Sequence, residues 1–274
     1  MRVLIDGVPV PDDRAAISVF DWGLQRGYGA FEVIRSYGGV AFRADAHLDR
    51  LATSAAALGM TLPPVDDLSA WVAGQAAEGG DCLIRVIATS GSRDPLFRSP
   101  PRVIVIIEPV PAVPPGYRVV PLAAPWAAGG VASELTGAKT LSYAPNIRAT
   151  EEAVEAGFHD ALLLSRDGHV LEGPTFSVAW FREGHMETSA MDLGILGSIT
   201  RVAAIEAAGR LGMDVVEGRF PLERLLGADE VVALSTVKEV LAIVAVGDVV
   251  FPAGAQGERL AKEFHEVVAA ETGT

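Results

Sequence analysis

Glu108-Pro-Val-Pro-Ala-Val-Pro-Pro-Gly116 is the stretch that divides this chain of 274 residues into two parts. It contains four prolines. Proline has no N–H donor and a fixed φ, so such a stretch forms neither a helix nor a central strand. We therefore predict an interdomain linker over residues 108–118. A small N-terminal α/β domain over residues 1–113 and a larger C-terminal domain over residues 119–274 are expected around it.

Strand and helix patterns alternate irregularly on both sides of the linker. Before it, we predict helices over 46–58 and 68–77, and strands over 2–5, 8–10, 31–37, 40–43, 83–89 and 102–108. After it, we predict helices over 147–156, 198–211 and 255–270, and strands over 161–165, 170–171, 178–181, 231–235 and 243–246. This order is not a simple βαβ repeat, and it indicates an α/β (α+β) chain of two domains.

The composition argues against several kinds of partner. A net charge of −13 disfavours nucleic acid and anionic membrane surfaces. The longest apolar runs, such as residues 103–107, are too short to cross a bilayer, and the first residues lack the apolar segment of a signal peptide. Cys82 is the single cysteine, which excludes an internal disulfide and fits a reducing compartment. We expect a cytoplasmic protein with small-molecule ligands.

Lysine is rare in this chain. Lys plus Arg totals 22, but only Lys139, Lys238 and Lys262 are lysines. An amine can lose its proton and attack a carbonyl, whereas a guanidinium cannot. Lys139 has no acidic residue three or four positions away. Either the count reflects a codon bias toward arginine, or Lys139 is kept for its chemistry.

A glycine-bounded loop, Gly194-Ile-Leu-Gly-Ser-Ile-Thr-Arg201, runs directly into a predicted helix. Ser198 is a suitable N-cap, and the N–H groups of Ile199 and Thr200 would then face outward at the positive end of the helix dipole. This arrangement binds phosphate, although an ordinary capped helix has the same pattern. Further candidates for holding the phosphate are the pair Ser235-Thr236, after a buried strand, and the cation Arg50.

Glu172 ends a predicted strand just before Gly173-Pro174. A carboxylate there either terminates the strand or, if buried, needs a cationic partner. A protonated pyridine nitrogen would be such a partner. A phosphate site, a nucleophilic lysine and a carboxylate for a pyridinium are together the features that bind pyridoxal phosphate.

Six motifs, in order along the chain, resemble those of the fold-type IV pyridoxal-phosphate enzymes. This group contains branched-chain aminotransferases, D-amino-acid transaminases, (R)-amine transaminases and 4-amino-4-deoxychorismate lyases. The motifs are Asp21-Trp-Gly-Leu-Gln-Arg-Gly-Tyr-Gly-Ala-Phe-Glu32, His47-Leu-Asp-Arg-Leu51, Lys139-Thr-Leu-Ser-Tyr143, Asp167-Gly-His-Val-Leu-Glu-Gly173, Gly194 to Arg201, and Ala228-Asp-Glu230 to Thr236.

The resemblance implies a fold, a cofactor and roles for individual residues. The fold is a small α/β domain followed by a larger domain with a barrel-like mixed sheet, in a homodimer whose active site lies near the interface. The cofactor is pyridoxal 5′-phosphate, and no metal is expected. Lys139 resembles the Schiff-base lysine, and Glu172 the partner of the pyridine nitrogen. The remaining cofactor-binding residues implied are Arg50, Tyr143, Ser198, Ile199, Thr200, Ser235 and Thr236.

Three cations stand at positions that the resemblance associates with substrate binding. Arg26 stands where an aromatic residue is common, Lys238 stands where a small residue is common, and Arg85 resembles an arginine of the branched-chain enzymes that faces the substrate side chain. The asparagine usual after the glutamate is replaced by the Phe176-Ser177 region. We expect the three cations to bind substrate carboxylates, although each could instead pair with an acidic residue at the surface.

The resemblance leaves several activities open. We expect transamination from D-amino acids, and some (R)-amines, to a 2-oxo acid. The alternative is 4-amino-4-deoxychorismate lyase, because Lys139-Thr-Leu-Ser-Tyr-Ala-Pro-Asn146 and Leu171-Glu-Gly-Pro174 resemble proteins assigned that activity. Branched-chain L-amino-acid transamination comes third, and a cofactor-free binding protein on the same fold is the non-enzymatic alternative.

Overall fold

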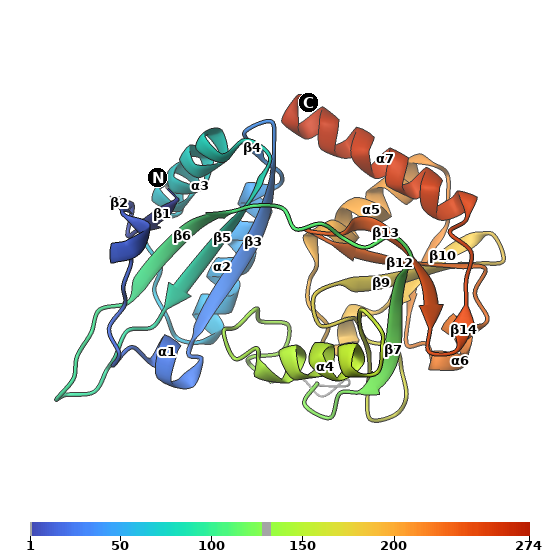
Figure 1. Ribbon diagram of the computed structural model, residues 1–274, viewed down its shortest axis with the longest axis horizontal. Helices are drawn as coiled ribbons and strands as arrows, with labels where there is room; N and C mark the ends of the chain where they lie inside the picture. The colour runs from blue at the N-terminus through green and yellow to red at the C-terminus, as the bar shows by residue number, and fades with distance from the viewer. Residues whose placement is uncertain (1, 128–132) are drawn as a thin grey trace. The chain divides into compact units, whose positions relative to one another are not determined.

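The computed structural model describes residues 2–127 and 133–274. These residues form two compact units (Figure 1). The first unit contains Met1–Pro111 together with two later segments, Ala138–Tyr143 and Ala270–Thr274. The second contains Ala112–Gly137 and Ala144–Ala269. The segment that carries Lys139 therefore belongs with the N-terminal part of the chain, although it follows the proline-rich stretch.

The first unit is built on a six-stranded sheet in the order β2-β1-β6-β5-β3-β4, and every neighbouring pair is antiparallel. Its strands are β1 (Val3–Ile5), β2 (Val8–Val10), β3 (Gly29–Tyr37), β4 (Val40–Ala41), β5 (Cys82–Thr89) and β6 (Arg102–Glu108). Its helices are the short α1 (Trp22–Arg26), α2 (Ala44–Ala57) and α3 (Val65–Gly79), with a 3₁₀ turn, η1 (Asp12–Arg14).

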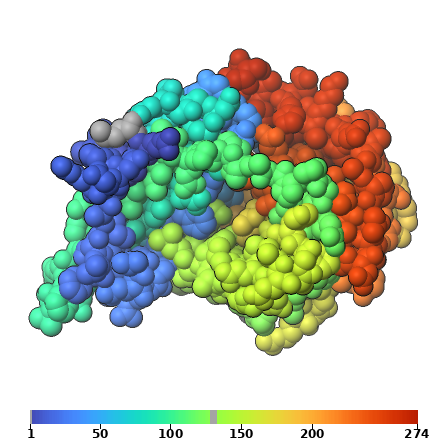
Figure 2. Space-filling view, viewed as in Figure 1, coloured from blue at the N-terminus to red at the C-terminus, as the bar shows by residue number. Residues whose placement is uncertain are grey.

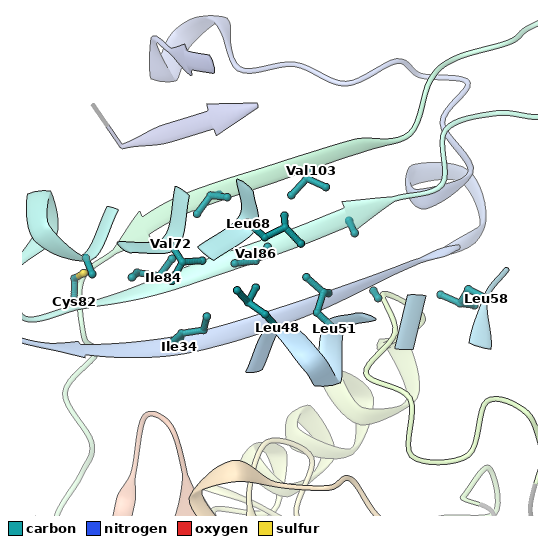
Figure 3. Close-up of a cluster of buried hydrophobic side chains, with 14 residues drawn as sticks. Ile34, Leu48, Leu51, Leu58, Leu68, Val72, Cys82, Ile84, Val86 and Val103 are labelled. Carbon is teal, nitrogen blue, oxygen red and sulfur yellow. The ribbon is translucent and has the colours of Figure 1, made fainter. Parts of the chain in front are cut away.

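Helices α2 and α3 cover one face of this sheet, and the core of the unit lies between them and the strands. Side chains alternate along β3, so that Ile34 points into this core while its neighbours Val33 and Arg35 point to the opposite face. Figure 3 shows Ile34 packed near Leu48 and Leu51 of α2. The side chains of Phe31, Val33 and Arg35 lie on the opposite face of β3.

A long loop, residues 90–101, connects β5 to β6. It extends outward at the lower left of Figure 2, beside the segment that contains α1. The two segments are joined by stacked rings of Phe20 and Phe97, whose centroids lie 4.5 Å apart, and by a hydrogen bond from Trp22 N to Gly91 O.

The second unit contains an eight-stranded mixed sheet in the order β11-β10-β9-β12-β13-β7-β8, with β14 paired to β13. Its strands are β7 (Tyr117–Ala123), β8 (Asp160–Leu164), β9 (Ser177–Arg182), β10 (His185–Ser189), β11 (Val215–Gly218), β12 (Glu230–Ser235), β13 (Glu239–Val246) and β14 (Val249–Val250). Its helical segments are α4 (Ala144–Glu155), η2 (Met191–Leu193), α5 (Ile199–Arg210), α6 (Leu222–Leu226) and α7 (Ala255–Thr272), the last of which ends within the first unit's C-terminal segment.

Most predicted elements are confirmed within a few residues of the predicted bounds, including the three long helices after the linker. The strand predicted over 170–171 is wrong, because Val170 makes only an isolated bridge to Leu164. The second unit also has strands that the sequence patterns missed, β7, β10, β11 and the short β14. None of the helices within residues 2–127 and 133–274 combines the length and the apolar character needed to cross a membrane.

Candidate active site

Lys139 is fixed by its backbone against β3 of the first unit. Its carbonyl accepts a hydrogen bond of 3.0 Å from Phe31 N, and its N–H donates one of 3.0 Å to Ser54 Oγ on α2. The next residue, Thr140, pairs with Ala30 in an isolated antiparallel bridge. Because both backbone groups of Lys139 are engaged, its Cα and the direction of its side chain are set by the sheet.

The amine of Lys139 lies against two aromatic rings. Its Nζ is 4.4 Å from the ring centroid of Phe31 and 5.6 Å from that of Tyr143. The two rings meet edge to face, with centroids 5.5 Å apart. The structure therefore brings together Lys139 and Tyr143, two residues that the resemblance assigns to one cofactor. The aromatic faces attract the ammonium form and keep the flexible side chain in one place.

A buried polar cluster lies on the other side of β3. The Glu32 carboxylate is fully buried, and it accepts two hydrogen bonds of 2.7 Å from Arg50 Nε and Nη2 and one of 2.7 Å from His47 Nδ1. Burial alone would raise the pKa of Glu32, but the bonds and charge of Arg50 and His47 outweigh it and lower the pKa to about 2. Burial also lowers the pKa of His47, so its neutral ring donates the Nδ1 proton.

Replacing Glu32 by glutamine is expected to lower the free energy of unfolding by about 3 kcal/mol at pH 7, because the Arg50 guanidinium loses its buried counter-charge. The folded-state pKa of Glu32 is lowered to about 2 from an ordinary value of 4.5. Its contribution is therefore complete above pH 5 and is lost as the pH falls from about 4.5 to about 2. Urea denaturation at several pH values measures both effects.

Glu155 provides a matched control for this prediction. Arg148 donates to both of its carboxylate oxygens at 3.0 and 3.1 Å, but both side chains are exposed on α4. Glu155→Gln should leave the urea midpoint almost unchanged, because water screens an exposed pair. If the two substitutions lower stability equally, burial is not the reason that Glu32 matters.

The loop before α5 of the second unit leads into a helix start that is capped by a serine. Gly194 adopts a left-handed conformation (φ 80°), and Ser198 is the N-cap, with its side chain accepting from Arg201 N. Ile199 and Thr200 are buried. Within the described part of the chain, their backbone N–H groups have no acceptor. Two buried, outward-facing donors at a helix N-terminus fit a phosphate group.

Glu172 contacts the loop that leads into this helix. Its Oε1 accepts a hydrogen bond of 3.1 Å from Leu196 N, and its backbone carbonyl accepts one of 2.8 Å from Leu163 N of β8. The structure thus joins two predicted cofactor-binding segments that lie more than twenty residues apart in the sequence. Ser235 is the last residue of β12 and Thr236 follows it in the next turn; Ser235 Oγ accepts from Lys238 N at 3.0 Å.

Lys238 is held in a small aromatic cage of the second unit. Its Nζ donates a hydrogen bond of 2.9 Å to Thr175 Oγ1 and lies 5.2 Å from the ring centroid of Tyr117 and 5.1 Å from that of Phe176. Burial lowers the pKa of the Lys238 amine, while Asp160 acts in the opposite direction. Among the described residues, no carboxylate lies within ion-pair distance of Lys238. An anionic ligand could supply the counter-charge of a half-buried cation in this state.

Arg85 has an acidic partner. Its Nε and Nη2 donate to the two carboxylate oxygens of Glu108 at 2.7 and 2.8 Å. Arg85 nevertheless lies on the sheet face that holds Lys139: it pairs with Val33 across β3 and β5, and Val33 shares its face with Phe31, whose ring contacts the Lys139 amine. The distance along the strand from Phe31 to Val33 is about 7 Å.

Arg26 is the last residue of α1 and is exposed to solvent. Its guanidinium carbon lies 5.4 Å from the ring centroid of Trp22.

The sequence reasoning missed the three residues around Lys238, namely Tyr117, Thr175 and Phe176. Their only signal was the position of Thr175-Phe176 directly after the motif that contains Glu172.

A family model described as Amino-transferase class IV matches residues 29–246. The chain belongs to the class IV aminotransferases. This assignment confirms the resemblance drawn from the six motifs and the mixed α/β fold class of two sheets. It also confirms the predicted cofactor of the family, pyridoxal 5′-phosphate.

Similar proteins include members with different activities. The chain is 27% identical to the D-alanine aminotransferase of Bacillus licheniformis, over 94% of this chain and 92% of the relative. It is 30% identical to the bifunctional aminodeoxychorismate lyase / D-amino acid transaminase of Mycobacterium tuberculosis, over 78% and 80%. A solved branched-chain aminotransferase from the thermophilic archaeon Thermoproteus uzoniensis, with norvaline, is 28% identical, with a TM-score of 0.88 and coverage of 99% and 95%.

Proposed function

We propose that this class IV aminotransferase moves an amino group from a D-amino acid, and from some (R)-amines, to a 2-oxo acid such as 2-oxoglutarate or pyruvate. The observation that carries the proposal is the half-buried Lys238 cation, held in place by Thr175 and two rings with no ion-pair partner among the described residues. A carboxylate on the substrate would supply the missing charge. The names of the two relatives above support D-amino acids as donors.

Each cofactor-binding residue has a role that its surroundings support. Bound pyridoxal phosphate supplies an aldehyde for the amine and a ring that accepts electrons. The amine of Lys139, held against Phe31 and Tyr143, takes the proton from the substrate α-carbon and returns a proton afterwards. Glu172 would hold a proton at the pyridine nitrogen.

The phosphate would be held by donors from several elements. The N–H groups of Ile199 and Thr200 supply two hydrogen bonds at the start of α5. Ser198 fixes the helix start as its N-cap. Ser235 shapes the turn after β12, which carries Thr236. The family resemblance also assigns Arg50 to the phosphate, and its bonds to the buried Glu32 fix its orientation within the first unit.

Substrate carboxylates would be bound by cations, with Lys238 as the main anchor. Arg85 uses two of its nitrogens for Glu108 and keeps Nη1 outside that ion pair. It therefore has one donor group to offer on the sheet face that it shares with Phe31. Arg26, exposed at the end of α1, is the third cation that we assign to the substrate.

The test compares two amino donors, each with 2-oxoglutarate as acceptor, in assays of the holoenzyme. D-alanine with 2-oxoglutarate should give D-glutamate and pyruvate, and L-leucine with 2-oxoglutarate should give much slower turnover. Chiral chromatography of the glutamate product distinguishes the two reactions. Formation of L-glutamate from L-leucine at the higher rate would replace the proposal by branched-chain transamination.

A lyase activity is the second candidate, favoured by the bifunctional Mycobacterium tuberculosis relative. A lyase would release p-aminobenzoate and pyruvate from 4-amino-4-deoxychorismate without any 2-oxo acid acceptor. The same holoenzyme incubated with this substrate alone measures that activity by the fluorescence of p-aminobenzoate. Release of p-aminobenzoate without any D-glutamate from the first assay would overturn the transaminase proposal.

Replacing Lys238 by methionine should raise the KM for 2-oxoglutarate by about 10- to 100-fold, because the pocket loses its charge-assisted bond to the carboxylate. Methionine keeps most of the apolar stem between the rings of Tyr117 and Phe176. Lys262→Met, on α7, is the matched control, since it removes the same charge elsewhere. Steady-state kinetics with both variants measure the difference, and equal KM values would remove Lys238 from the substrate site.

A further inference from the structure

The cage around Lys238 is backed by a buried carboxylate. Asp160, at the start of β8, is 3% exposed. Its Oδ2 accepts a hydrogen bond of 3.1 Å from the Tyr117 hydroxyl and lies 3.5 Å from Thr175 Oγ1. Its Oδ1 accepts from Thr150 Oγ1 at 2.7 Å and from Ala161 N at 2.9 Å. Asp160 thus contacts two of the three groups that hold the Lys238 amine.

The direction of these hydrogen bonds follows from the chemistry of the groups. The Lys238 ammonium has only donors, so Thr175 Oγ1 accepts its proton and directs its own hydroxyl proton elsewhere. Asp160 Oδ2 is the acceptor that the structure places within reach. Burial and the neighbouring Asp160 carboxylate raise the pKa of Tyr117, so the Tyr117 hydroxyl keeps its proton and donates it to the same oxygen.

The residues of the cage differ in their exposure to solvent. Thr175 is exposed to solvent, while Asp160 and Phe176 are buried. A ligand can therefore approach the amine and the Thr175 hydroxyl, but it cannot reach the Asp160 carboxylate. A direct Asp160–Lys238 ion pair would neutralise the cation, whereas the intervening hydroxyl stabilises its position and leaves N–H donors for a ligand.

We propose that Thr175 and Asp160 are positioning residues for Lys238: they hold its ammonium over the rings of Tyr117 and Phe176 so that it binds a carboxylate of a dicarboxylic 2-oxo acid. This inference rests on the proposed function and deepens it. It also explains why Phe176 and Lys238, two departures from the family pattern, occur in the same chain: their side chains are in contact. Neither positioning residue takes part in the proton transfer at Lys139.

Thr175→Val and Thr150→Val form a matched pair of variants. Both remove a threonine hydroxyl near the Asp160 carboxylate, but only Thr175 touches Lys238. Thr175→Val should raise the KM for 2-oxoglutarate about tenfold and weaken the binding of glutarate to the holoenzyme by a similar factor, while kcat changes less than KM. Thr175→Ser should restore both values, and Thr150→Val should leave them near those of the original protein.

Calorimetric titration with glutarate, steady-state kinetics and thermal denaturation decide the result. The effect of Thr175→Val should vanish in a Lys238→Met background, because the two residues act through one contact. Equal KM changes in Thr175→Val and Thr150→Val, or an undiminished effect in the Lys238→Met background, would overturn the inference. Either result would leave the proposed function standing if Lys238→Met alone still raised KM. No change in KM for Lys238→Met would instead count against the carboxylate site itself.

Discussion

Replacing Lys139 by alanine is expected to reduce the turnover of D-alanine with 2-oxoglutarate by more than about 10⁴-fold, since the variant loses both its nucleophilic amine and its general base. The amine of Lys139 is the group held against Phe31 and Tyr143, and its backbone is tied to β3 and to Ser54. Fixed-time assays of D-glutamate formation measure the loss of turnover. Borohydride should fix the cofactor to the original protein and leave the variant without covalently bound pyridoxyl.

Two controls separate chemistry from folding. Lys262, on α7, is the one lysine of this chain to which we assign no role, and Lys262→Ala should keep full turnover. The thermal midpoint of Lys139→Ala should stay near that of the original protein, because its backbone bonds to Phe31 and Ser54 do not need the side chain. Turnover within tenfold of the original in Lys139→Ala would show that another amine performs the reaction.

The segments that we propose to bind the cofactor could be identified from the sequence because each of them is a local pattern. A glycine-bounded loop before an N-cap serine predicts helix-end donors, and α5 begins at Ile199 with Ser198 as its cap. The strands of the first sheet could also be predicted, because apolar and β-branched residues are grouped between turn residues such as Asp6-Gly7 and Gly38-Gly39. Such features depend on neighbours within a few residues, so a single sequence contains the information.

The surroundings of the proposed substrate cations depend instead on contacts between distant segments. Arg85 and Glu108 are neighbours only because β5 and β6 pair in one register, which places Ile106 opposite Arg85. Lys238 meets Thr175 across 63 positions of sequence. No spacing rule predicts such pairs, so the sequence could identify these cations but not which of them already has an acidic partner.

Contacts between distant segments also explain why some strands were not predicted from the sequence. β10 is His185–Ser189, a polar run that reads as a loop, yet four of its five residues are buried. Its Glu187 carboxylate is satisfied by Trp180, His185 and Arg224, which come from three different elements. Polar strands become stable when tertiary partners satisfy their side chains, and this information is absent from local hydrophobic periodicity.

Replacing Glu172 by glutamine is expected to lower kcat by about 10²- to 10³-fold with a smaller change in KM. Glu172 would hold a proton at the pyridine nitrogen, and loss of one member of a partly buried charge pair costs about 3–4 kcal/mol at most. Glutamine is nearly the same size and still offers an oxygen to Leu196 N, the contact that joins this residue to the loop before α5. The loop, and with it the phosphate donors of Ile199 and Thr200, should therefore stay in place.

Rapid mixing of the holoenzyme with D-alanine isolates the step in which the substrate loses its α-proton. The rate of this step should fall in Glu172→Gln as much as kcat does, whereas the dissociation constant of pyridoxal phosphate should change by less than about tenfold, because the phosphate donors are retained. Glu172→Asp keeps the charge on a shorter side chain. Its rate of α-proton loss should lie between those of Glu172→Gln and the original protein. If Glu172→Gln releases the cofactor while its loaded fraction reacts at the original rate, then the carboxylate acts as an anchor and another group controls the ring proton.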